Sequence, residues 1–171
     1  PFQAKQSDRE ASRLLEAVIA ASRRPALYGP GGVPDTLSGR FELLSLHAAL
    51  ALVRLRAAPE QAALAQLFTD KLFRHIDSGL REAGVGDLSV PKRMRRLAGD
   101  FYGRREAYAA PLAAGDSAGL ADAIGRNVLG EGADPSVTTK LADYAARVAE
   151  RQQAGPVAAL AEASAWEPGS A

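Results

Sequence analysis

Apolar residues recur along most of this chain at intervals of three and four, the spacing of an amphipathic α-helix. We expect helices over about residues 7–23, 36–57 and 59–83, followed by a basic helix that begins after Ser89. A fifth should begin near Asp116 or Ser117, a sixth should cover about residues 137–148, and a short last one should begin at Pro156. No stretch alternates apolar and polar residues as a strand does. The pattern predicts an all-α protein, a single-domain bundle of about six to seven helices over residues 1–171.

The helix expected over residues 36–57 is apolar on most of its circumference, which places it in the middle of the core. Its exception is a stripe at seven-residue spacing, formed by Arg40, His47 and Arg54. Two interpretations stay open: the stripe forms hydrogen bonds with carbonyls and carboxylates inside the bundle, or it marks a surface where a partner docks. We favour the internal role, since buried charges need partners within their own fold.

The segment GVGDLSVPKRMRRLAGDFYGRREAY, residues 84–108, concentrates positive charge on one predicted helix. Ser89 is a good N-cap residue, Pro91 suits the first turn, and Gly103 is expected to end or bend the helix. At 100° per residue, one face carries the apolar residues Val90, Met94, Leu97, Phe101 and Tyr108. The candidate binding site for a polyanion or an acidic partner consists of Lys92, Arg93, Arg95, Arg96, Arg104 and Arg105. The alternative is a solvated charged face with no binding role.

Charge and composition make any binding of polyanions local. The net charge is +1, whereas residues 92–106 carry +4, so the rest of the chain is slightly acidic. DNA is not an expected partner. The chain has no Cys, no apolar run that approaches a membrane span, and no signal-peptide pattern in its first ten residues.

Catalytic and metal-binding patterns are weak. A metal site would need His47 and His75, the two histidines, to meet near a carboxylate such as Asp70 or Asp77. The better interpretation is that His47 is a hydrogen-bonded polar group on a buried helix. The Gly-rich segments lack the Lys-Ser/Thr of a phosphate-binding loop, and no Ser lies in a G-x-S-x-G context. We therefore predict no enzyme activity, no metal and no cofactor.

Three segments resemble the ubiquinol–cytochrome c chaperone family in its alphaproteobacterial form. They are VPDTLSGRFELLSLHAALALVRLR (33–56), LFTDKLFRHIDSGLREAGVGDLSVPKRMRRLAGDFYGRREAY (67–108) and GRNVLG (125–130), within a match over roughly residues 12–130. The resemblance implies a non-enzymatic chaperone that holds newly made cytochrome b during assembly of the ubiquinol–cytochrome c reductase (bc1) complex. Family members in mitochondria work near the ribosomal exit tunnel with a small partner protein. The resemblance further implies a cytoplasmic protein, peripheral to the inner membrane, that contacts the ribosome or an anionic membrane surface.

A chaperone for a membrane protein needs an exposed apolar groove. The candidate rim of such a groove is the Pro/Gly-rich loop 25–34, with Leu27, Tyr28 and Val33. The equal alternative is that Leu27 and Tyr28 cap the core. Three other functions stay open: an adaptor that binds RNA or anionic membranes without client specificity, a haem-handling protein that uses His47 or His75, and a helical enzyme.

Overall fold

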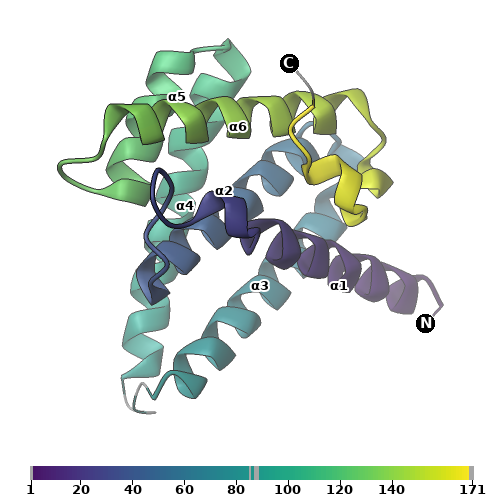
Figure 1. Ribbon diagram of the computed structural model, residues 1–171. Helices are drawn as coiled ribbons and strands as arrows, with labels where there is room; N and C mark the ends of the chain where they lie inside the picture. Colours follow the sequence, from purple (N-terminus) through teal and green to yellow (C-terminus); the bar gives the residue numbers. More distant parts are fainter. Residues whose placement is uncertain (1, 85, 87–88, 170–171) are drawn as a thin grey trace.

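The protein is an all-helical bundle, and the predicted fold class is confirmed (Figure 1). The computed structural model describes residues 2–84, 86 and 89–169. The α-helices of this part of the chain are α1 (Phe2–Ser22), α2 (Leu37–Arg56), α3 (Ala62–Glu82), α4 (Val90–Ala114), α5 (Ser117–Ile124) and α6 (Pro135–Ala154). Short helical turns add η1 (Pro25–Leu27), η2 (Pro59–Gln61), η3 (Gly125–Leu129), η4 (Val157–Ala161) and η5 (Ala163–Trp166).

Helix α2 is the central helix, as its sequence predicts, because apolar or small residues occupy nearly all of its sides. It packs against α1, α3, α4 and α6, and one continuous core takes side chains from every α-helix. Thr36 caps its N-terminus by accepting a hydrogen bond from the Gly39 amide at 3.0 Å. A Cβ at Gly39 would lie 2.0 Å from the Pro34 carbonyl oxygen, so the entry into this helix requires glycine.

Helix α4 corrects one prediction, since it runs without a break through Gly103 and Pro111 to Ala114. Phe101 and Tyr108, on either side of Gly103, are both fully buried. Their packing holds the helix together at a residue whose own propensity opposes it. The helix ends instead at Gly115, which adopts the left-handed conformation with φ of 64°.

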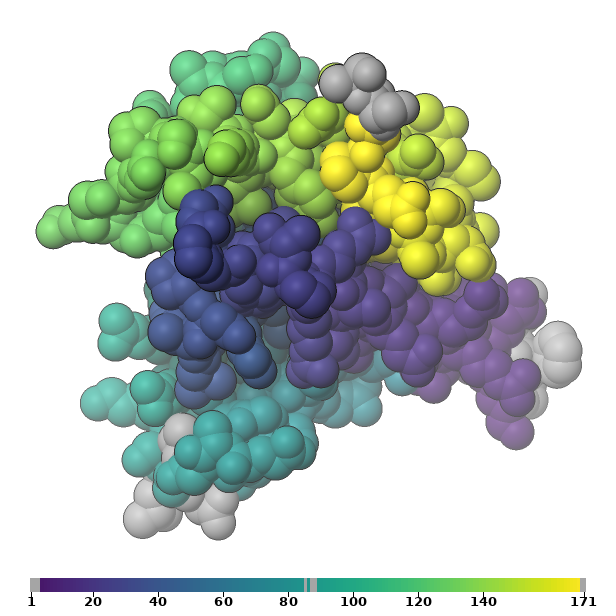
Figure 2. Space-filling view, viewed as in Figure 1, coloured from purple at the N-terminus to yellow at the C-terminus, as the bar shows by residue number. Residues whose placement is uncertain are grey.

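The short last helix expected from Pro156 is present as two 3-10 turns, η4 and η5, and this end of the described chain folds back over the bundle. Turns η4 and η5 lie against α1 and α6, and in Figure 2 the yellow segment borders the purple helix. Trp166 is fully buried, and its indole Nε1 donates to the Leu160 carbonyl at 2.8 Å. Arg24 donates to the Trp166 carbonyl at 2.7 Å and so fastens the segment to the end of α1.

Candidate functional site

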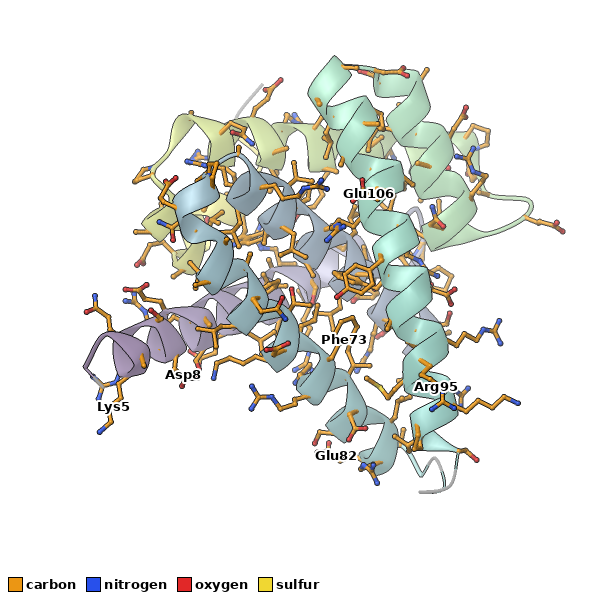
Figure 3. All side chains as sticks on the ribbon, turned by 180° about the vertical axis from the view of Figure 1, so that it is seen from behind. Lys5, Asp8, Phe73, Glu82, Arg95 and Glu106 are labelled. Carbon is orange, nitrogen blue, oxygen red and sulfur yellow. The ribbon has the colours of Figure 1, made fainter. Side chains whose placement is uncertain are left out.

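The first turns of α4 present a cluster of four cations, which we call the basic tip: Lys92, Arg93, Arg95 and Arg96. All four are exposed, and none of their side chains forms a hydrogen bond or an ion pair with the described part of the chain. Val90 is fully buried on the opposite face, while Met94 and Leu97 are only half-buried. Figure 3 shows Arg95 at the end of the molecule where α3 and α4 lie close together, near Glu82. Ser89 occupies the N-cap position, but its side chain makes no capping hydrogen bond.

Arg104 and Arg105 lie apart from this cluster, so the six predicted residues do not form one continuous patch. The Arg104 side chain is only 13% exposed, and its Nη2 donates to Glu42 Oε1 on α2 at 2.6 Å. Arg105 lies 5.1 Å above the Tyr102 ring and pairs with Glu106 at 2.7 Å. The helical spacing explains why Arg104 is buried, because this residue lies between Phe101 and Tyr108 on the inward face of the helix.

The contact between Arg104 and Glu42 belongs to a group of polar side chains between α2 and α4 that also includes Tyr108, whose pKa depends on burial and on both charges. Three atoms of these side chains are buried and make no hydrogen bond with the described chain: Glu42 Oε2, Arg104 Nε and Tyr108 OH. Burial raises the pKa of Glu42, although Arg104 opposes the shift. Burial likewise raises the pKa of Tyr108 above its usual value. Nothing in the sequence pairs Glu42 with Arg104, because their contact depends on how α2 and α4 pack.

The stripe of Arg40, His47 and Arg54 divides into three separate environments. Arg40 is exposed and pairs with Asp35 at 2.7 Å, so its place in a buried stripe is wrong. Its hydrogen bonds hold the pKa of Asp35 below the usual value. Arg54 is half-buried and donates to the carbonyls of Gln152 and Gly155 at 2.8 and 3.0 Å, which ties α2 to the end of α6.

His47 is fully buried, and both ring nitrogens have partners. Its Nδ1 lies 2.7 Å from the Leu43 carbonyl oxygen, which can only accept, so Nδ1 carries the proton. Its Nε2 then accepts from the Tyr144 hydroxyl at 2.7 Å. Burial lowers the pKa of His47 to about 4. The side chain is therefore neutral near pH 7, and neither nitrogen is free to bind haem iron or another metal.

The predicted groove at loop 25–34 is wrong for Val33, which is 1% exposed and faces the core. Leu27 and Tyr28 are half-buried and pack against that core. The Tyr28 hydroxyl donates to the Ser22 carbonyl at 2.7 Å, and the Val33 amide donates to the Leu27 carbonyl at 2.8 Å. These bonds hold the loop in a closed conformation. Its apolar residues therefore cap the core and do not form the rim of a groove.

An apolar hollow does occur, at a place that sequence reasoning missed. It is an open cleft of about 430 Å³ where the end of α2, the first half of α3 and the middle of α4 meet. We call it the α2–α3–α4 cleft, and its lining is Leu52, Leu55, Arg56, Ala58, Pro59, Ala62, Ala65, Gln66, Thr69, Tyr102 and Arg105. In Figure 3, α3 and α4 diverge from the basic tip toward the end that carries Glu106. The one signal in the sequence is Tyr102, an aromatic residue that lies off the apolar face of its helix.

A second hollow, of about 450 Å³, lies between the end of α6 and turns η4 and η5. Its lining includes Arg151, Gln152, Pro156 and Leu160. Within the residues that the structure describes, no group of three His, Cys, Asp or Glu side chains is arranged to hold a metal ion. In the same residues, no helix is long and apolar enough to cross a membrane.

Comparison with known proteins gives two matches. The family model described as ubiquinol–cytochrome C chaperone matches residues 31–166. A solved structure, described as the crystal structure of the Cbp3 homolog from Brucella abortus, is similar with a TM-score of 0.83 and 39% sequence identity. That alignment covers 95% of this chain and 90% of the other. None of the curated proteins compared with the chain is significantly similar to it.

Proposed function

Because the chain belongs to the ubiquinol–cytochrome c chaperone family, we propose that it is a non-enzymatic assembly chaperone of the bc1 complex that binds newly made cytochrome b. The observation that carries the proposal is the family match over residues 31–166, supported by a related structure that aligns with nearly the whole chain. The family match covers helices α2 to α6 and the structural alignment covers 95% of the chain, so the proposal concerns the whole bundle.

Two surfaces support a role in binding a newly made client protein. The basic tip places four unpaired cations at one end of the molecule, which suits a polyanionic surface such as ribosomal RNA or anionic lipid headgroups. The α2–α3–α4 cleft offers apolar surface farther along α4. A chaperone that uses both would sit on the ribosome or the inner face of the inner membrane while it holds apolar client segments, with or without a small partner protein.

The test is a pull-down from the native membrane fraction with the tagged full chain as bait. We expect cytochrome b, alone or with other bc1 subunits, among the retained proteins, and reduced bc1 assembly in a strain that lacks the protein. Recovery of ribosomes or anionic lipids without any bc1 subunit would contradict the proposal and favour the adaptor without client specificity. A haem-handling role through His47 is disfavoured, because Leu43 and Tyr144 engage both nitrogens of its ring.

A further inference from the structure

The α2–α3–α4 cleft has an apolar floor, and small side chains line the wall on its α3 side. Leu52, Leu55 and Ala58 form the floor and are each less than 10% exposed. Ala62 and Ala65 line the wall that α3 provides, and they are more accessible than the floor. Small side chains on a wall let the backbone of an incoming helix approach closely, while the floor accepts its larger apolar side chains.

The α4 side of the cleft carries an aromatic ring that the fold leaves exposed. Tyr102 is 41% exposed, although its ring lies 5.7 Å from the buried Phe101 and 6.0 Å from Phe73. The Arg105 guanidinium lies above this ring. Tyr and Arg are the residue types that most often contribute large shares of binding energy at protein interfaces. The pair thus presents a rigid apolar surface with a cation beside it.

The rim of the cleft has an excess of positive charge. Arg56 and Arg105 come from α2 and α4, and both donate to the same oxygen, Glu106 Oε1, at 2.8 and 2.7 Å. One carboxylate therefore pairs with two guanidinium groups, and each group keeps further N–H donors that make no hydrogen bond with the described chain. An incoming carboxylate would find a complementary charge here, whereas an incoming cation would be repelled.

We infer that the α2–α3–α4 cleft is the docking groove for an apolar helix of the client that carries an Asp or Glu at the edge of its apolar face. This inference rests on the proposed function, since it assigns the client's contact to one surface. The apolar side chains of the helix lie on Leu52 and Leu55 between the alanines and Tyr102. Its carboxylate accepts hydrogen bonds from Arg105 and Arg56.

A matched pair of substitutions tests the site with little risk to the fold. Ala62→Trp fills the cleft, whereas Ala63→Trp adds the same ring at the next residue, which is also exposed but does not line the cleft. Each variant is co-expressed with cytochrome b from the same organism, and the retained cytochrome b is quantified. We expect retention to fall at least tenfold with Ala62→Trp and to stay within twofold of wild type with Ala63→Trp.

The charge is tested with fluorescent 20-residue peptides that tile the same cytochrome b, measured by anisotropy against the full chain. For the tightest peptide, replacing its acidic residues by their amides should weaken binding several-fold. With the Arg105→Gln variant the same replacement should have little further effect. If the replacement weakens peptide binding equally in wild type and in Arg105→Gln, Arg105 does not bind the carboxylate and its proposed role is overturned.

The outcomes separate the inference from the proposed function. If wild type and Ala62→Trp retain cytochrome b equally, the cleft is not the docking site, although the chaperone function stands. If wild type retains no cytochrome b, both the function and the inference fail. If light scattering shows that Ala62→Trp converts a dimer into a monomer, the cleft holds a second copy of this chain, and the inference is overturned.

Discussion

Arg104 on α4 and Glu42 on α2 form an ion pair with 2.6 Å between Nη2 and Oε1, and their side chains are only 13% and 10% exposed. Arg104 also lies 5.6 Å from the Phe41 ring and 3.9 Å from Asp100 Oδ2. The pair spans residues that are 62 positions apart and joins the central helix to the helix that carries the basic tip. It removes from the surface a cation that the sequence alone assigns to the binding cluster.

Removing one partner of this pair should be more harmful than removing both. Arg104→Met leaves Glu42 buried without its cation, which should lower the free energy of unfolding by about 3 kcal/mol. The double variant Glu42→Leu/Arg104→Met exchanges the pair for apolar contacts and should recover much of that loss. Urea unfolding monitored by circular dichroism measures the loss in each single variant, Arg104→Met and Glu42→Leu, and in the double variant. A double variant as unstable as the sum of the two single losses would contradict the interpretation of a coupled pair.

His47 should make the stability fall as the pH drops from about 6.5 to about 4. In this window the unfolded chain binds a proton at His47 while the folded protein, with a pKa of about 4, does not. The full loss in the free energy of unfolding is about 3 kcal/mol, and above pH 6.5 the whole contribution of His47 is present. Glu42, with its raised pKa, acts in the opposite direction, since its contribution is lost as the pH rises through the folded value.

The measurement is urea unfolding at several pH values with wild type, His47→Gln and His75→Gln. Between pH 6.5 and 4.5, the free energy of unfolding should depend less on pH in His47→Gln than in wild type. In His75→Gln the dependence should persist. In the His75→Gln protein, the NMR signals of the one remaining histidine should not titrate above pH 5. Titration of that ring near pH 6.5 would show that His47 is not buried as described.

The basic tip should bind anionic surfaces in a salt-dependent way. Replacing Arg93, Arg95 and Arg96 by Gln should abolish binding to vesicles rich in anionic lipid and to ribosomes. The melting temperature should hardly change, since the three side chains are exposed and unpaired. Co-sedimentation at increasing salt measures the binding.

The matched control for the tip is the variant with Arg9, Lys140 and Arg147 replaced by Gln. It removes the same charge from exposed positions on α1 and α6. Equal binding by the two variants would mean that net charge, and not the tip, determines the interaction.

Trp166 should anchor the end of the chain to the bundle. Its ring is fully buried and its nitrogen is hydrogen-bonded, so Trp166→Ala should lower the free energy of unfolding by about 3–5 kcal/mol. Thermal and urea unfolding by circular dichroism measure the loss. Because this is the one tryptophan of the chain, its fluorescence in the wild type should also report the release of the segment. A loss below 1 kcal/mol would show that the segment adds little to stability.

Local sequence was sufficient for most of the helices and for the exposed cations. The apolar spacing in α3 and α6, the caps at Thr36 and Asp116, and the composition of α2 each act within one or two turns, so they are readable without the fold. The exposure of Lys92, Arg93, Arg95 and Arg96 follows equally from the inward face of their own helix.

Tertiary packing decided what lies between the helices. Whether α4 continues through Gly103, which carboxylate Arg104 pairs with, and whether Val33 faces the core depend on residues far away in the chain. The α2–α3–α4 cleft likewise exists because α3 and α4 diverge over the end of α2. The sequence by itself determined which segments are helical and which faces are apolar, since these depend on neighbours three and four residues away. Only the tertiary structure decided which polar groups were buried together and where apolar surface stayed open, because both depend on how helices distant in sequence pack.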